Sequence, residues 1–169
     1  RIAALVKKTD PTRLVNNASG WTDKGVGDMM DIHVYPGPAM APVEPRRASV
    51  LGEFGGLGLP VEGHIWIDKG NWGYRSYPDP KALTAAYVEL FERMDPLVTQ
   101  GLSAAIYTQT SDVEIEVNGW LTYDRKVWKV DPKRAKAAAK KLFAPRKPIH
   151  TLVMTALDGD TARWSFTTS

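Results

Sequence analysis

Four short apolar runs constrain the fold of this chain more than any other feature of its sequence. The strands that they predict include residues 14–15, 29–34, 49–52 and 103–107. Apolar side chains largely follow one another in these runs instead of alternating with polar ones. This pattern is typical of strands that are buried on both faces, as in parallel sheets.

Two helices are marked by start signals after the third and fourth of these strands. Asp79 precedes Pro80, and Asp131 precedes Pro132. An aspartate N-cap followed by proline at the first helical position is typical of a helix start. We expect Pro96 to kink the first of these helices or to end its regular part. Strands that alternate with helices indicate βα units around a parallel sheet, an α/β fold.

The chain changes character near residue 145. Residues 151–154 and 163–166 are rich in β-forming side chains and flank an Asp-Gly-Asp turn, which predicts an antiparallel hairpin. We therefore expect two parts, a main α/β domain over residues 1–145 and a linker with the first strands of a β domain over residues 146–169.

Composition excludes several classes of protein. The 169 residues include no cysteine, which rules out disulfides, thiolate zinc sites and a cysteine nucleophile. No apolar run approaches the roughly 18 residues that a membrane span needs. The net charge of +3 comes mostly from residues 129–147. That stretch could contact nucleic acid, or it could be the solvated face of a helix. The solvated face is the commoner case, so we expect no nucleic-acid partner.

Glu53 is the most informative candidate for chemistry. It directly follows a predicted buried strand and precedes Phe54-Gly55-Gly56, where glycines allow a sharp turn and the close approach of a ligand. Position alone does not decide its role, because a helix-capping or ion-paired glutamate would fit the same place.

Three segments resemble one known family. They are residues 50–56 (VLGEFGG), residues 30–36 (MDIHVYP), and residues 107–114 (YTQTSDVE) with their continuation at 116–125 (EVNGWLTYDR). In this order and spacing they resemble family 2 glycoside hydrolases, the group of β-galactosidases and β-glucuronidases. The matches span most of residues 1–143.

The resemblance implies strands five to eight of a (β/α)8 TIM barrel, at residues 14–17, 29–34, 49–53 and 103–109, followed by the start of a β-sandwich-like domain. It implies that Glu53 is the nucleophile of a retaining glycosidase and that Tyr35 is its hydrogen-bond partner. Retention requires a second carboxyl group about 5–5.5 Å away. In this family that acid/base follows an asparagine at the end of strand four. We expect it upstream of Arg1, on the rest of the polypeptide or on a partner chain that completes the barrel, so this chain alone should be inactive.

Further polar and aromatic residues are candidates for binding the carbohydrate substrate. They are Asn16, His33, Tyr107 and Gln109, together with Trp66 and Trp72 of the long loop after the third strand. The family's tryptophan platform at the end of strand eight is absent here, where Tyr107 and Gln109 stand instead. Each tryptophan has packing as its simpler explanation.

A few further charged residues are candidates for metal binding. Asp31 and His33 share one face of a strand and offer two ligands, too few for a metal site, so we expect no metal and no cofactor. Asp112, Glu114 and Glu116 alternate on a loop, where they could hold substrate or a structural cation, although solvated charges are the default interpretation.

The sequence thus favours an exo-acting, β-galactosidase-like retaining glycosidase. The alternative is a non-catalytic carbohydrate-binding or scaffold fragment of a barrel, and a metal-dependent hydrolase built on Asp31 and His33 is a weaker one. The chain begins at Arg1 without methionine, which suggests a processed or truncated product. Its compartment is undetermined, with a periplasmic or secreted location favoured over a cytoplasmic one.

Overall fold

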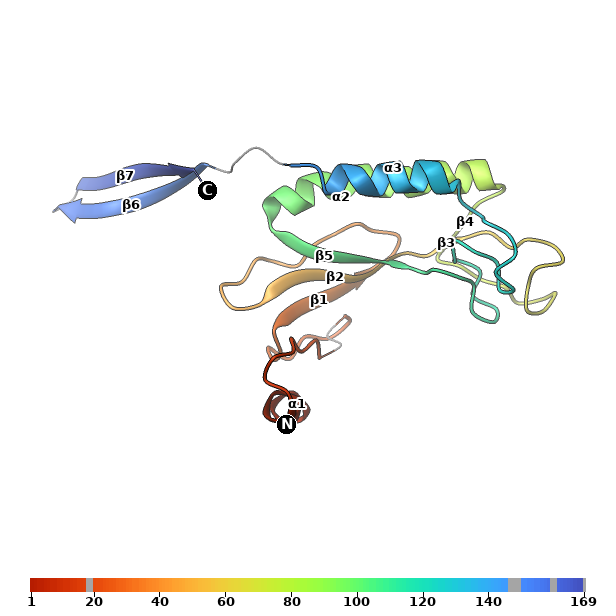
Figure 1. Ribbon diagram of the computed structural model, residues 1–169, viewed down its shortest axis with the longest axis horizontal. Helices are drawn as coiled ribbons and strands as arrows, with labels where there is room; N and C mark the ends of the chain where they lie inside the picture. Colours follow the sequence, from red (N-terminus) through yellow and green to blue (C-terminus); the bar gives the residue numbers. More distant parts are fainter. Residues whose placement is uncertain (18–19, 146–149, 159–160, 169) are drawn as a thin grey trace.

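A computed structural model of the protein describes residues 1–17, 20–145, 150–158 and 161–168, and only the backbone beyond residue 149. Figure 1 shows the elements in sequence colours. In chain order they are α1 (Ile2–Thr9), β1 (Met29–Val34), β2 (Ala48–Gly55), β3 (Leu57–Gly58), β4 (Arg75–Ser76), α2 (Pro80–Gln100), β5 (Leu102–Thr108), α3 (Pro132–Leu142), β6 (His150–Asp158) and β7 (Thr161–Thr168).

The centre of the fold is a three-stranded parallel sheet in the order β1-β2-β5. The central strand β2 is almost entirely buried, as its apolar run predicts. The expectation of burial on both faces is wrong for β5, in which Ile106 is 57 % exposed. A three-stranded sheet leaves β1 and β5 as edge strands, so their side chains have fewer neighbours.

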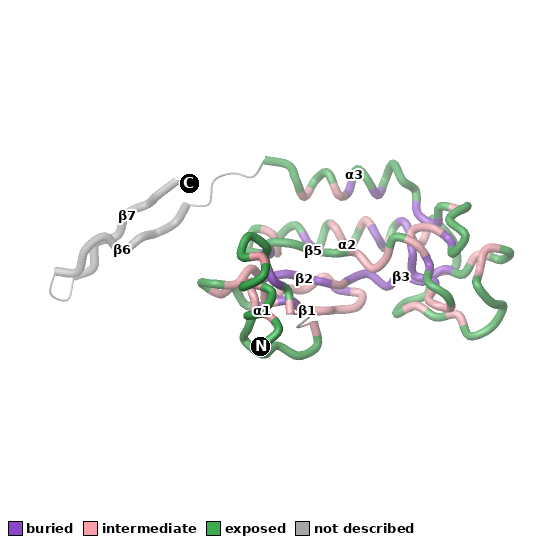
Figure 2. Tube along the Cα trace, turned by 60° about the horizontal axis from the view of Figure 1, so that its bottom comes forward, coloured by how far each residue is buried: buried purple, intermediate pink, exposed green. Residues whose placement is uncertain are grey.

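Helices α2 and α3 form one layer on the same side of the sheet (Figure 1). Apolar residues of α2 recur every three or four positions and face β2 and β5. The core they build includes Leu51, Phe54, Leu57, Leu83, Tyr87, Leu90, Met94 and Leu102. In Figure 2 the buried trace follows β2 and β3, whereas α1 and the outer loops are exposed.

Both predicted helix starts are confirmed. The side chain of Asp79 accepts a hydrogen bond from the Ala82 N–H, and the side chain of Asp131 caps α3 in the same way. Helix α2 does not end at Pro96 but continues to Gln100, and Gly101 closes it with a left-handed backbone. Pro96 has no N–H and therefore removes one hydrogen bond of the helix. It lies in an exposed position near the end of the helix.

The expectation that this chain forms half of a TIM barrel is wrong. The described residues form three helices and a three-stranded parallel sheet with two further two-stranded sheets, which is too few elements, and the parallel sheet does not close. Residues 14–17 are not a strand. The backbone of Val15 is hydrogen-bonded to Asp28 instead. The Val15 N–H donates to Asp28 Oδ2 at 2.6 Å, and the Val15 carbonyl accepts from the Asp28 N–H at 2.8 Å.

The predicted hairpin is confirmed as the antiparallel pair β6 and β7. The glycine of its predicted turn lies outside the described residues, as does the expected linker at 146–149. A single hairpin does not make a β-sandwich, so a separate β domain over residues 146–169 stays a prediction. None of the described helices is long and apolar enough to cross a membrane.

Candidate functional site

Glu53 lies at the carboxyl end of the central strand and is the one residue of β2 beyond Ala48 that is not buried. Its side chain is 41 % exposed. The Tyr35 hydroxyl, just after β1, donates a hydrogen bond of 2.5 Å to Glu53 Oε2. Burial, and then this hydrogen bond, raise the pKa of Tyr35 above its usual value. Tyr35 therefore stays protonated and remains a donor to the carboxylate at neutral pH.

His33 approaches the same carboxylate oxygen from β1. A register shift between Ile32 and His33 places His33 directly opposite Glu53 on the neighbouring strand. The His33 Nδ1 atom lies 3.3 Å from Glu53 Oε2, and its Nε2 atom lies 3.8 Å from Asp31 Oδ2. The contact of Nδ1 with Glu53 is an ion pair only when the imidazole is protonated.

Asp31 is a buried carboxylate beneath these residues. Its Oδ2 atom accepts a 2.7 Å hydrogen bond from the Asn16 amide, and its Oδ1 atom accepts a 2.9 Å bond from the Gly52 N–H. A Cβ atom on Gly52 would collide with this carboxylate, so the site requires glycine there. Asp31 thus fixes the backbone one residue before Glu53.

An aromatic wall stands beside the carboxylate. Tyr74 stacks on Tyr35 with ring centroids 3.6 Å apart and planes 2° apart, and the Trp72 ring meets Tyr74 edge-on at 5.4 Å. Gly56 has φ +61°, and a Cβ atom there would press on both tyrosine rings. Burial, then the charges of Glu116 and Glu53, raise the pKa of Tyr74. Both Tyr74 and Trp72 keep an exposed surface.

The structure places the other predicted binding residues outside this cluster. Gln109 donates a 2.8 Å hydrogen bond to Asn118, which donates to Glu116, and the Thr108–Gln109 peptide is cis. The Tyr107 ring packs against Phe54, Tyr87 and Trp120 in the core, where burial raises its pKa. Trp66 contacts Tyr123 at 4.8 Å in a separate aromatic pair.

The eight predicted site residues therefore divide into two groups. Glu53, Tyr35, His33 and Asn16 gather at one end of the sheet, with Trp72 joined to them through Tyr74. Tyr107, Gln109 and Trp66 do not touch that cluster through any described contact.

Sequence reasoning did not assign roles to two buried acids. The spacing of Asp31 and His33 predicts that both share a face of the strand, but it does not predict the hydrogen bonds that Asp31 accepts from Asn16 and Gly52. Asp112 is not a solvated charge, because it forms a buried ion pair with Lys129 at 2.5 Å. These partners lie 17 positions apart in the sequence, and nothing local in the sequence links them.

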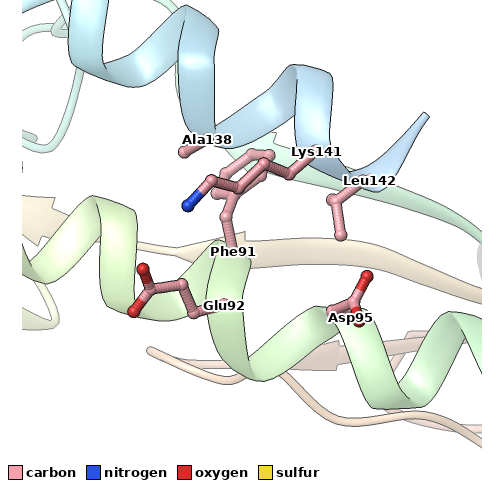
Figure 3. Close-up of a pocket in the computed structure, with 6 residues that line it drawn as sticks. All are labelled: Phe91, Glu92, Asp95, Ala138, Lys141 and Leu142. Atoms are coloured by element: carbon pink, nitrogen blue, oxygen red, sulfur yellow. The ribbon is translucent and has the colours of Figure 1, made fainter. Parts of the chain in front are cut away.

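Within the described part of the chain, no three potential ligands lie close enough together to hold a metal ion. Figure 3 shows a cavity of about 390 Å³ between α2 and α3, into which the Phe91 ring points, with Glu92 and Asp95 at its side. That cavity belongs to the helix layer and not to the site at the strand ends.

No family model matches the chain, and no curated protein matches it. The likeness to family 2 glycoside hydrolases thus stands on the quoted motifs alone.

Proposed function

We propose that the protein is a retaining, exo-acting glycosidase of β-galactosidase-like specificity and that Glu53 is its nucleophile. The observation that carries the proposal is that two side chains lie against the same oxygen of the Glu53 carboxylate. Tyr35 donates to Glu53 Oε2 at 2.5 Å, and His33 Nδ1 lies 3.3 Å from the same atom. A partly exposed carboxylate held in this way at the end of a parallel strand suits attack on a ligand from solvent.

The chemistry follows from this arrangement. With Oε2 held by Tyr35 and His33, Oε1 of Glu53 attacks the anomeric carbon while the glycosidic bond breaks and the leaving oxygen takes a proton. The resulting glycosyl ester is then cleaved by water, which restores the carboxylate and releases the sugar. The net reaction consumes one water molecule for each glycosidic bond.

The proton donor has to be a second carboxyl group. Asp31 lies near His33, as Glu53 does. It is buried and accepts hydrogen bonds from Asn16 and Gly52, so it cannot reach a leaving group. We propose that the acid/base comes from further polypeptide, either upstream in the same protein or on a partner chain. The exposed apolar side chains of α1, including Ile2 and Leu5, offer a surface on which such polypeptide would pack.

Recognition of the sugar would use the aromatic wall. Trp72 and Tyr74 combine exposed ring surface with a position beside Glu53, and flat ring faces pack well on the C–H face of a sugar. Asn16 acts indirectly in this proposal, because its amide is bonded to Asp31.

The second candidate function is carbohydrate binding without catalysis. It is favoured by the exposed aromatic rings of Trp72 and Tyr74 beside Glu53. In that case Glu53 would accept hydrogen bonds from sugar hydroxyls and form no covalent bond.

Covalent trapping tests the proposal. The full-length protein is incubated with 2-deoxy-2-fluoro glycosides of galactose, glucose, mannose and glucuronic acid, digested, and examined by mass spectrometry. We expect a sugar-mass adduct on the peptide that contains Glu53, no adduct in Glu53→Gln, and an unchanged adduct in the control Glu62→Gln, which alters an exposed loop residue. Folded protein that forms no adduct with any of the four sugars would exclude catalysis and leave the binding function.

A further inference from the structure

The hydroxyl of Tyr35 lies between two other polar side chains, each from a different strand. It donates to Glu53 Oε2 on β2 at 2.5 Å, and it is also hydrogen-bonded to the side chain of Thr108, the last residue of β5. Tyr35 itself follows directly after β1, and β2 lies between β1 and β5 in the sheet. The three side chains thus form a chain of hydrogen bonds across the carboxyl end of the sheet.

The pairing of β2 with β5 places the Thr108 side chain on the face of the sheet that carries Glu53. Phe54 lies opposite Tyr107, and their rings pack together in the core beneath the helices. The next pair is Gly55 opposite Thr108. Because successive side chains of a strand point to opposite faces, Thr108 points away from the helices, as Glu53 does.

Two consecutive glycines at the end of β2 allow Thr108 and Tyr35 to approach each other. The Gly55 N–H donates to the carbonyl of Pro36, the residue after Tyr35, at 2.9 Å. The Gly56 N–H donates to the carbonyl of Thr108 at 2.9 Å. A Cβ atom on Gly56 would come within 2.8 Å of the Tyr35 ring. The segments that carry Tyr35 and Thr108 are therefore both fixed to the same pair of glycines.

The direction of the two hydrogen bonds follows from the chemistry of the groups. An ionised carboxylate can only accept, whereas a tyrosine hydroxyl has one proton to donate and an oxygen that accepts. Tyr35 therefore uses its proton on Glu53, and its oxygen accepts from Thr108. Burial and the contact with Glu53 raise the pKa of Tyr35, whereas the hydrogen bond with Thr108 lowers it. A bond donated to the tyrosine oxygen has this effect because it stabilises the phenolate.

The consequence concerns the orientation of a single proton. A hydroxyl that accepts one hydrogen bond becomes a stronger donor in the next, because the bonds in a chain polarise one another. We propose that Thr108 is a positioning residue that turns the hydroxyl proton of Tyr35 onto the Glu53 carboxylate. Thr108 acts through Tyr35 and not by contact with the sugar. Its effect on the reaction rests on the proposed glycosidase function, whereas the hydrogen bond itself does not.

Covalent trapping of Glu53 in the full-length protein measures the effect of the Thr108 hydroxyl. Thr108→Val keeps the shape of the side chain and removes the hydroxyl, whereas Thr108→Ser keeps the hydroxyl. With the most reactive 2-deoxy-2-fluoro glycoside, we expect trapping to be about three- to tenfold slower in Thr108→Val, the effect of one hydrogen bond between uncharged groups. Thr108→Ser should retain the wild-type rate. Thr110→Val, which changes an exposed threonine two residues further on, is the matched control and should also retain it.

A double-mutant cycle tests whether Thr108 acts through Tyr35. In Tyr35→Phe the partner hydroxyl is absent, so adding Thr108→Val should slow trapping no further. The wild type, both single variants and the double variant are also unfolded with urea, a measurement that needs no catalysis. Thr108→Val should lower the urea midpoint of the wild type more than that of Tyr35→Phe. Thr108→Ala, which is smaller and also lacks the hydroxyl, takes its place if circular dichroism shows that Thr108→Val is unfolded.

Three results would overturn the proposal. The first is a wild-type trapping rate in folded Thr108→Val, and the second is an equal slowing in Thr108→Ser. The third is an equal fall of the urea midpoint with and without the Tyr35 hydroxyl. If no sugar labels the wild-type protein, the glycosidase function fails, and the urea cycle alone then decides whether Thr108 holds the Tyr35 hydroxyl.

Discussion

The backbone N–H of Gly52 donates a 2.9 Å hydrogen bond to the buried carboxylate of Asp31 on the neighbouring strand, one residue before Glu53. The candidate nucleophile is therefore positioned by a contact that it does not itself make. Gly52→Ala should displace Asp31, because the added Cβ atom would occupy the place of the carboxylate. We expect a loss of about 1–3 kcal/mol in the free energy of unfolding, measured by urea denaturation.

The same variant should slow covalent trapping at Glu53 even in protein that remains folded. Glu62→Gln serves as the comparison, because it changes an exposed residue in a turn. Wild-type stability and trapping rate in Gly52→Ala would show that Asp31 does not fix the strand.

Tyr35→Phe removes the hydroxyl that holds Glu53 Oε2 and leaves the stacking on Tyr74. Hydrogen bonds to charged groups contribute about 1.5–3 kcal/mol, which corresponds to roughly a ten- to hundredfold fall in the rate of trapping. The rate is measured by the time course of adduct formation with the most reactive fluoro sugar.

Tyr77→Phe is the matched control, because Tyr77 lies near the core and contacts neither Tyr35 nor Glu53 in the described structure. An equal slowing in both variants would assign the effect to the loss of any tyrosine hydroxyl near the core and not to the Tyr35–Glu53 bond.

Lys129→Met leaves the Asp112 carboxylate buried without its partner. Breaking a buried ion pair on one side costs about 3–5 kcal/mol, so the free energy of unfolding should fall by that amount. Lys126→Met removes an exposed lysine three residues away and should change stability by less than about 0.5 kcal/mol.

The double variant Asp112→Leu/Lys129→Met should recover only the part of the loss that comes from the unpaired charge, because the Leu59 and Val117 carbonyls and the Gly119 N–H lose their partners. A single variant as stable as the wild type would show that Asp112 is not held as a buried anion.

Arg47 makes stability depend on pH in the acidic range. Its guanidinium donates to Asp23 at 2.7 and 2.8 Å and to Glu44 at 2.6 and 2.7 Å. These hydrogen bonds lower the pKa of both carboxyl groups from their ordinary values of 3.8 and 4.5. A lowered pKa in the folded state stabilises it above the ordinary pKa, and that stabilisation is lost as the pH falls below about 4.

Arg47→Met should therefore lower the urea midpoint at pH 7, and the difference from wild type should shrink between pH 4.5 and pH 2.5. Arg93→Met on the exposed side of α2 should show no such convergence. A difference that stays constant over this range would show that Arg47 acts through packing and not through charge.

The elements that were predicted correctly from sequence carry their signal locally. The apolar runs of β1, β2 and β5 and the Asp-Pro caps of α2 and α3 are each readable within a few residues. The predicted strand at residues 14–17 is wrong because the backbone N–H and carbonyl of Val15 form hydrogen bonds with Asp28. No local pattern reveals this contact.

The same distinction applies to the candidate site. The proximity of Glu53, Tyr35 and His33 was predicted because all three sit at or just beyond the ends of adjacent strands. The direction of the Tyr107 ring was not predicted. The register of β5 against β2 shifts between Leu51 and Phe54, so the alternation of side chains along the strand does not tell which face Tyr107 occupies. The buried pair of Asp112 and Lys129 depends on loops that meet only in the folded chain.

The three hydrogen bonds of Lys129 also restrict where residues can be inserted into the chain. Through the Leu59 and Val117 carbonyls this lysine ties the start of the long loop to the segment after β5, so an insertion beside either residue would break the tie. Around Gly70 the loop is exposed, and a Cβ atom there would touch nothing. New sequence such as a reporter peptide is therefore best inserted at Gly70.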